Sequence, residues 1–269
     1  MSLKRDVLWL LKRYNISISK KLGQHFLVDE KIMKKVIQYL EPQKDDIVLE
    51  IGSGLGILTN LVAAHVKKVY AVEKDARMAE ITRKLARDNV EVIVGDFLKI
   101  ELPDFNKIIG NIPYAISSQI TAKILLLKFD IAVLMYQKEF AERFKADPGT
   151  KKYGRITILV NYYADVELLD EVSPKAFYPK PEVYSRIVRF RRLKEPRVHV
   201  KSEELFFEIT RILFSQRRKK VRNILRNYGI PFDEDAPYLE MRGDALSIEQ
   251  IAELVNYISE RKPHGGNPW

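Results

Sequence analysis

One stretch of this sequence decides its fold: Ile47-Val48-Leu49-Glu50-Ile51-Gly52-Ser53-Gly54-Leu55-Gly56. Its apolar first half predicts a buried strand, and its glycines predict a turn that opens a helix. Glycines at such a turn let the backbone approach a ligand, and the helix start aims its N–H groups outward. The spacing is G-x-G-x-G, whereas dinucleotide-binding proteins use G-x-G-x-x-G. The turn therefore disfavours NAD and favours S-adenosylmethionine, which has no pyrophosphate.

Short apolar strands alternate with helical segments on both sides of this stretch. The alternation predicts a mostly parallel seven-stranded sheet covered by helices on both faces, a Rossmann-like α/β fold. The expected strands are 46–51, 68–73, 90–95, 107–111, 131–136, 156–165 and 183–191. The expected helices are 57–65, 75–87, 117–127 and 138–145, preceded by one within the first fourteen residues and one that Asp29 caps.

The periodicity changes near Arg191 and is helical from Glu203 onward. We expect the later helices at 203–213, 215–228, 233–241 and 247–260. The sequence therefore predicts an α/β domain over 1–195, which includes an N-terminal helix and extension over 1–20. A smaller all-α domain is expected over 196–269.

Composition limits the class of partner. The net charge is +10, from 46 basic and 36 acidic residues, which favours an anionic partner, with nucleic acid first. There is no cysteine, and the four histidines show no metal-ligand spacing. No apolar run is long enough to cross a bilayer, and the N-terminus has no secretory signal. We expect a cytoplasmic monomer that binds neither metal nor membrane.

Two acidic residues end the strands that follow the glycine turn. Glu73 lies twenty-one residues after Gly52, a place that suits the two ribose hydroxyls of an adenosine. Asp96 ends the next strand and is positioned to accept from an adenine amine, with Phe97 beside the ring. Because the carboxyl ends of parallel strands meet at one edge of the sheet, these groups predict a ligand crevice there.

The fourth strand ends at the same edge with Asn111-Ile112-Pro113-Tyr114. An exocyclic amine on a nucleobase is a poor nucleophile because its lone pair is delocalised into the ring. The Asn111 side chain and the Ile112 backbone offer two carbonyl acceptors for its N–H bonds. Pro113 fixes the turn, and Tyr114 offers a face for stacking the base. The motif predicts methylation of a nucleobase amine beside the cofactor.

Taken together, these motifs resemble the small-subunit ribosomal RNA adenine N6,N6-dimethyltransferase family over roughly residues 18–260. The stretch Lys21–Leu27 is similar to the family's K-x-x-G-Q-x-F-L motif, Glu50–Gly54 to its E-I-G-x-G loop, and Phe177–Val183 to its F-x-P-x-P-x-V segment. The resemblance implies a class I methyltransferase domain. It also implies that Phe177 walls the base pocket opposite Tyr114. The implied cofactor contacts are Gln24, His25, Leu27, Gly52, Gly54, Glu73, Asp96, Phe97 and Asn111.

The resemblance further implies one enzyme that dimethylates two adjacent adenosines in the 3′-terminal hairpin of small-subunit rRNA, using S-adenosylmethionine. The implied partner is the immature small ribosomal subunit during its assembly. Two alternatives stay open. One is a related methyltransferase acting on large-subunit rRNA or on DNA adenine. The other is a non-catalytic nucleic-acid-binding factor, for assembly or transcription, on the same fold.

A basic segment in the second domain is the predicted RNA contact. Residues 211–226 contain seven basic and no acidic residues, and a continuous helix would align Arg218, Arg222 and Arg226 on one face. Without counter-charges such a face favours phosphate binding over a solvated surface. A second basic run lies between Arg186 and Arg197. The expected RNA-binding residues are Arg217, Arg218, Lys219, Lys220, Arg222 and Arg226.

Overall fold

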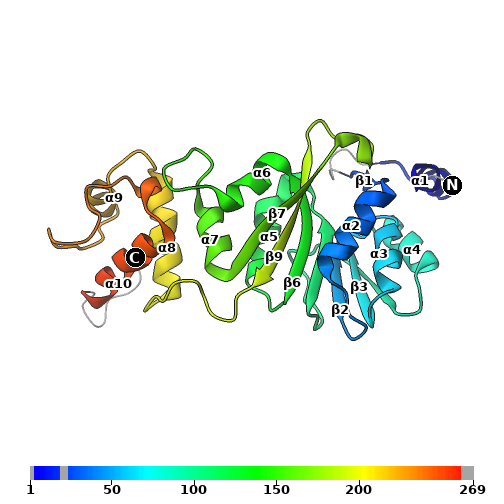
Figure 1. The fold of residues 1–269 in the computed structure, drawn as a ribbon, viewed down its shortest axis with the longest axis horizontal. Coiled ribbons are helices and arrows are strands. Elements are labelled where there is room, and N and C mark those ends of the chain that lie inside the picture. Colours follow the sequence, from blue (N-terminus) through cyan, green and yellow to red (C-terminus); the bar gives the residue numbers. More distant parts are fainter. Residues whose placement is uncertain (1–2, 19–23, 262–269) are drawn as a thin grey trace. The chain divides into compact units, whose positions relative to one another are not determined.

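The computed structural model describes residues 3–18 and 24–261 and divides the chain into two compact units. Unit 1 comprises Met1–Ala141 with Val166–Arg192, and unit 2 comprises Glu142–Asp165 with Leu193–Trp269. Figure 1 shows the elements of both along the chain. Residues 21–23 of the predicted cofactor motif, and both ends of the predicted extension over 1–20, lie outside the described residues.

Unit 1 is built around the predicted sheet, with strand order β4-β3-β2-β5-β6-β9-β7. Strand β2 (Ile47–Ile51) lies next to the central strand β5 (Lys107–Asn111) and is parallel both to β5 and to β3 (Lys68–Glu73), whereas β9 pairs antiparallel with β6. The chain runs outward from β2 in one direction and later from β5 in the other. A crevice at the carboxyl ends of β2 and β5 follows from this reversal. The remaining strands are β4 (Val90–Val94), β6 (Ile131–Gln137), β7 (Ala164–Val172) and β9 (Ser185–Arg192).

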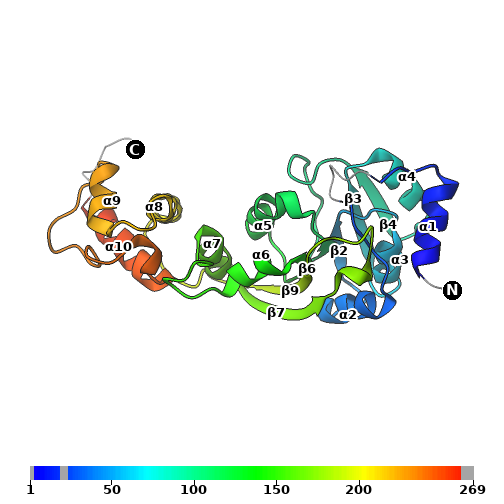
Figure 2. The same ribbon diagram turned by 90° about the horizontal axis from the view of Figure 1, so that it is seen from above.

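Helices cover both faces of this sheet, as the sequence predicts. Figure 2 shows α2 (Glu30–Leu40) on one face and α5 (Ser117–Leu125) on the other. Helix α2 begins where expected, because the Asp29 carboxylate accepts hydrogen bonds from the backbone N–H groups of Lys31 and Ile32. The other helices of unit 1 are α1 (Leu3–Arg13), α3 (Ile57–Ala63) and α4 (Ala76–Leu85); α6 (Lys138–Glu142) ends at the first residue of unit 2.

A second, two-stranded sheet was not predicted. Strand β1 (Phe26–Leu27) pairs antiparallel with β8 (Phe177–Tyr178), so that two motifs far apart in the sequence lie side by side. Partners across a strand pair point to the same face. Leu27 and its partner Phe177 are both buried in the core of unit 1, against residues such as Val172. Phe26 and Tyr178 instead pack against a separate apolar cluster.

The prediction of a strand over 156–165 is wrong. Those residues form helix α7 (Arg155–Tyr163), and the seventh strand of the sheet is β7, which starts at Ala164. The β-branched run Ile156-Thr157-Ile158 favours a strand locally. Packing within unit 2 overrides that preference, since the Tyr162 ring stacks on Phe206 with centroids 5.0 Å apart. Residues 142–165 consequently belong to unit 2, whereas the sequence placed them in the first domain.

Unit 2 is mainly helical, with α8 (Glu203–Ser215), α9 (Val221–Asn227) and α10 (Ile248–Glu260) around a buried core that includes Phe206, Leu213 and Leu254. Serines cap α8 and α10, because the Ser202 and Ser247 side chains each accept a hydrogen bond from the backbone N–H three residues further on. Two helix predictions are wrong. The segment 216–220 is a turn that separates α8 from α9, and residues 233–241 contain no helix.

Candidate active site

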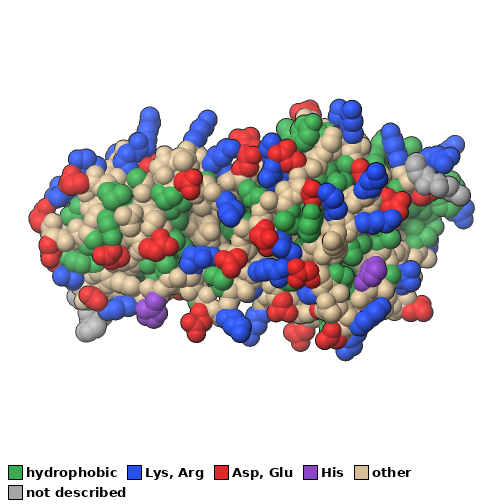
Figure 3. Space-filling model, viewed as in Figure 1, with side chains coloured by type: hydrophobic (Ala, Val, Ile, Leu, Met, Phe, Trp, Pro, Cys, Tyr) green, Lys and Arg blue, Asp and Glu red, His purple; other side chains and the backbone are tan. Residues whose placement is uncertain are grey.

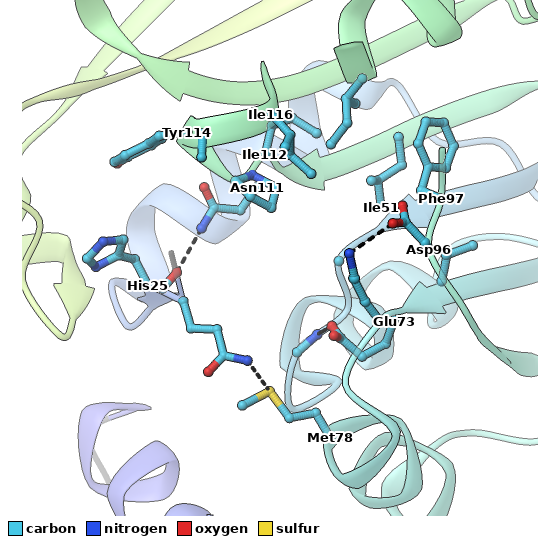
Figure 4. Close-up of a pocket in the computed structure, with 18 of the residues that line it drawn as sticks. His25, Ile51, Glu73, Met78, Asp96, Phe97, Asn111, Ile112, Tyr114 and Ile116 are labelled. Carbon is cyan, nitrogen blue, oxygen red and sulfur yellow. Dashed lines mark hydrogen bonds and ion pairs between the residues drawn. The ribbon is translucent and has the colours of Figure 1, made fainter. Parts of the chain in front are cut away.

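The crevice predicted by the strand order is a cavity of unit 1, at the carboxyl ends of the central strands (Figure 4). The glycine turn forms one side. Gly52 and Gly54 adopt φ values of 78° and 57°, which residues with a Cβ rarely adopt. A Cβ on Gly54 would lie 3.2 Å from the Phe26 ring. These glycines therefore give the cavity space that larger residues would fill.

The Glu73 carboxylate fixes the glycine turn by accepting backbone hydrogen bonds. One carboxylate oxygen accepts the Gly54 N–H at 2.8 Å, and the other accepts the Asp75 N–H at 2.8 Å. The side chain lines the cavity although the residue is only 8% exposed. Burial raises the pKa of Glu73 above its ordinary value, while the two N–H donors oppose that rise. Each oxygen keeps a second lone pair for a ligand hydroxyl.

Asp96 and Phe97 lie further along the same wall (Figure 4). The Asp96 carboxylate accepts the Leu98 N–H at 3.0 Å and pairs with the Lys74 ammonium at 2.8 Å. The hydrogen bond from Lys74 holds the pKa of Asp96 below its ordinary value. An ionised carboxylate is an acceptor only, so this group is suited to receive the N–H of an amine.

Asn111 faces these carboxylates from the end of β5. Its side-chain Nδ2–H donates to the His25 backbone carbonyl at 2.8 Å. This bond fixes the orientation of the amide, so Oδ1 points away from that carbonyl (Figure 4). The backbone N–H of Ile112 donates to the Met135 carbonyl at 3.0 Å, which ties the start of the motif to β6. The motif is thus held rigidly at both residues.

The Tyr114 ring is held at its edge and along its face. Its hydroxyl lies 2.7 Å from the Ser185 hydroxyl, and its ring stacks with His25 at a centroid distance of 5.8 Å. His25 is fixed in turn, because its Nδ1 lies 2.7 Å from the Pro179 carbonyl and must donate to it. The aromatic plate predicted for the base is therefore positioned by two other segments of the chain.

The structure brings together most of the predicted site residues. The cavity is lined by Gln24, His25, Gly52, Gly54, Glu73, Asp96, Phe97, Asn111, Ile112, Pro113 and Tyr114. Two predicted residues lie elsewhere. Leu27 and Phe177 face the core because they are partners across β1 and β8, and neither lines the cavity.

Several lining residues were missed from the sequence. Met78 of α4 lines the cavity and accepts a hydrogen bond from the Gln24 amide at 3.6 Å. Ile51 and Ile116 add apolar surface. Met78 and Ile116 come from helical turns after strand ends, where an apolar residue is indistinguishable from a core position. Ser185, which holds Tyr114, begins β9 and carries no signal of its own.

The predicted RNA-binding face differs from its prediction in two ways. Residues 216–220 interrupt the helix, so Arg218 does not share a helical face with Arg222 and Arg226. Counter-charges also exist, since Glu234 pairs with Arg222 and Arg226, Glu240 with Lys220 and Arg222, and Asp244 with Arg217. Only Arg218 and Lys219 of the six make no ion pair within the described part of the chain.

The second basic run is also largely neutralised. Arg186 pairs with Glu171, Arg189 with Glu167, and Arg197 with Asp165.

Over residues 3–18 and 24–261, no helix is both long and apolar enough to cross a membrane. The same residues contain no cluster of three or more side chains suited to hold a metal ion.

The strand order and the cavity at the carboxyl ends of β2 and β5 define a class I methyltransferase. Residues 15–260 match the model of the ribosomal RNA adenine dimethylase family. The chain belongs to this family, and the predicted activity, rRNA adenine dimethylation, is confirmed at that level.

Two archaeal relatives illustrate the sequence similarity. A probable ribosomal RNA small subunit methyltransferase A of Methanopyrus kandleri is 46% identical over 221 residues, covering 81% of this chain and 79% of the relative. The protein of the same name in Methanococcus maripaludis is 45% identical over 251 residues, covering 91% and 92%.

Two solved structures share the fold. A dimethyladenosine transferase from Plasmodium falciparum superposes with a TM-score of 0.74 at 30% identity, covering 84% of this chain and 94% of that one. The 23S rRNA methyltransferase ErmE gives 0.68 at 26% identity, covering 87% and 99%. The predicted fold class is confirmed.

Proposed function

We propose that this enzyme dimethylates N6 of two adjacent adenosines in the 3′-terminal hairpin of small-subunit rRNA, with S-adenosylmethionine as methyl donor, during assembly of the subunit. The names of the relatives in Methanopyrus and Methanococcus support the small subunit as substrate. One structural observation carries the catalytic part. The Asn111 amide is oriented by the His25 carbonyl, so that its oxygen is the atom left to accept from a target amine.

The cavity fits the proposed donor. The Glu73 carboxylate, already braced by Gly54 and Asp75, would accept from both ribose hydroxyls with its remaining lone pairs. Asp96 would accept from the adenine amine, and Phe97 and Ile51 would contact the ring. S-adenosylmethionine supplies a methyl group on a sulfonium sulfur that is already activated for in-line attack. The protein's task is then positioning, which contributes much of the rate in such transfers.

Asn111 and Ile112 would activate the target amine. In the first transfer, hydrogen bonds from its two N–H groups to the Asn111 Oδ1 and the Ile112 carbonyl draw the nitrogen lone pair out of conjugation with the ring. The same two acceptors stabilise the positive charge that develops on nitrogen as the bond to carbon forms, and the nitrogen then releases one N–H proton to solvent. The Tyr114 ring, fixed by Ser185 and His25, would stack under the extruded base.

We propose that the segment 216–226 contacts the rRNA backbone and that its basic residues contribute unequally to binding. Arg218 and Lys219 have no carboxylate partner within the described residues, so they are available to phosphates. Arg217, Lys220, Arg222 and Arg226 would first have to exchange a carboxylate for a phosphate. We therefore assign the main contribution to Arg218 and Lys219.

The test supplies tritiated S-adenosylmethionine and compares undermethylated small subunits, naked small-subunit rRNA, large-subunit rRNA and duplex DNA. Mass mapping should locate dimethyladenosine at two neighbouring positions of the 3′-terminal hairpin. An Asn111→Ala variant serves as the inactive control. If only large-subunit rRNA or only DNA became labelled, that nucleic acid would be the substrate in place of small-subunit rRNA. Binding to small subunits without label would support the non-catalytic factor.

A further inference from the structure

Helix α1 (Leu3–Arg13) is amphipathic, and its apolar side is already used by the fold. Val7, Leu10 and Leu11 are at most 7% exposed and form one cluster with Leu55 and Ile81. Leu55 belongs to the glycine turn, and Phe26, which lines the cavity, packs against the same cluster. The helix is therefore built onto the segments that form the active site.

The outward side of α1 is basic and aromatic. Lys4, Arg5, Lys12 and Arg13 are exposed, and none makes an ion pair with any residue that the structure describes. Trp9 is 56% exposed, and the Arg13 guanidinium lies 5.0 Å from its ring. Arg5 and Arg13 stand one helical turn to either side of Trp9 and so share its face. Figure 3 shows basic side chains gathered where Figure 1 draws α1.

This arrangement differs from the other basic segments of the protein. Three arginines of β9 and both arginines of α9 pair with carboxylates, whereas the four cations of α1 form no ion pair within the described residues. The family match begins at residue 15, so α1 lies outside it. An exposed tryptophan among unpaired cations combines a stacking surface with phosphate-binding charges.

We propose that α1 is an additional RNA-binding element of this enzyme, in which Trp9 stacks on an unpaired base and Arg5 and Arg13 bind the flanking phosphates. The ligand is the rRNA strand near the target adenosines, so this inference rests on the proposed function. The position of α1 supports this RNA-binding role. The Lys4 ammonium lies 6.0 Å from the Tyr178 ring, and Tyr178 follows Phe177 on the strand that pairs with β1 beside the cavity.

A membrane surface is the other partner that a basic amphipathic helix can bind. That role needs an apolar side free to enter the lipid. Here Val7, Leu10 and Leu11 are buried in the protein, and Leu8 and Trp9 are the apolar residues of α1 that remain exposed. Because two side chains make a poor apolar face, the helix fits a polyanion better than a bilayer.

The test measures the affinity of the full-length protein for undermethylated small subunits over a series of salt concentrations. Trp9→Ala should weaken binding about 5- to 150-fold, as expected for loss of one stacked base. Trp9→Phe should recover much of that affinity. Arg5→Gln/Arg13→Gln should lower the slope of log affinity against log salt by about 1.4 to 1.8. Alanine and glutamine favour helices, so these exposed changes preserve α1.

Lys44→Gln/Lys67→Gln is the matched control. Both lysines are exposed, make no ion pair within the described residues, and precede β2 and β3, at the sheet edge opposite the cavity. This variant should keep the wild-type slope. Equal effects of the two double variants, or an unchanged affinity of Trp9→Ala, would overturn the proposal. The proposal would also be overturned if the protein bound phosphatidylcholine–phosphatidylserine vesicles through α1 while its affinity for RNA did not depend on Trp9. Failure of the wild type to methylate small subunits would instead overturn the proposed function.

Discussion

Replacing Glu50 by glutamine should remove much of the pH dependence of this protein's stability. Glu50 lies on β2, an inner strand of the sheet, and is 2% exposed. Its Oε2 atom has no hydrogen-bond partner within the described residues. Burial raises the pKa of the Glu50 carboxyl from 4.5 to about 7, and the neighbouring Glu73 charge adds to the rise.

The direction of the effect follows from proton binding. Between about pH 4.5 and 7 the folded protein keeps a proton on Glu50 that the unfolded chain has released. The free energy of unfolding must therefore fall as pH rises through this range. One pKa unit corresponds to about 1.4 kcal/mol, so the full fall attributable to Glu50 is about 3 kcal/mol. Glu50→Gln holds a neutral side chain at every pH and loses this fall.

Urea denaturation of the ligand-free protein at several pH values between about 5 and 8 measures the effect. The wild type should lose stability across the range, and Glu50→Gln should keep only the smaller fall that Glu73 contributes, since burial raises the pKa of Glu73 as well. Glu101→Gln, at an exposed carboxylate, is the control and should follow the wild type. An unchanged slope in Glu50→Gln would refute the argument.

Three further predictions concern the site. Asn111→Ala should lower the methyl transfer rate about 10²- to 10³-fold, as expected for the loss of a preorganised electrostatic contact. The affinity for S-adenosylmethionine should change only a few-fold. A normal rate would show that Asn111 is not the acceptor for the target amine. Glu73→Ala should weaken S-adenosylmethionine binding about 10²- to 10⁴-fold by calorimetry, because two ribose hydrogen bonds to a charged group are lost. Wild-type affinity would contradict that role. Arg218→Gln/Lys219→Gln should lower the slope of log affinity for rRNA against log salt by about 1.4 to 1.8. Arg222→Gln should lower this slope less, because the Arg222 guanidinium is already paired with carboxylates. A larger effect of Arg222→Gln would reassign the RNA contact.

The sequence was sufficient for the parts of the fold and site that depend on local pattern. The glycine turn, Glu73, Asp96 and Asn111 each follow a short apolar strand, and parallel strands bring such ends to one edge. Asp29 and the capped helix after it were predicted for the same reason, since a cap is a local hydrogen bond.

Long-range packing explains the failures. The β-branched residues of α7 favour a strand locally, but the helix is the form that lets Tyr162 of the same segment stack on Phe206. Phe177 faces the core because it pairs with Leu27, a contact that spans most of unit 1. The carboxylates of Glu234 and Glu240 lie outside the basic segment whose charge they neutralise, so counting charges within that segment overestimated its free cations.

A crystal structure of the protein with S-adenosylmethionine and adenosine would test the central claim most directly. We predict the donor ribose on Glu73, its adenine beside Asp96 and Phe97, and the adenosine ring stacked on Tyr114. The N6 amine should lie within hydrogen-bonding distance of the Asn111 Oδ1, while the Asn111 Nδ2 keeps its bond to His25. A donor bound outside this cavity, or an Asn111 amide turned with its nitrogen toward the amine, would contradict the account.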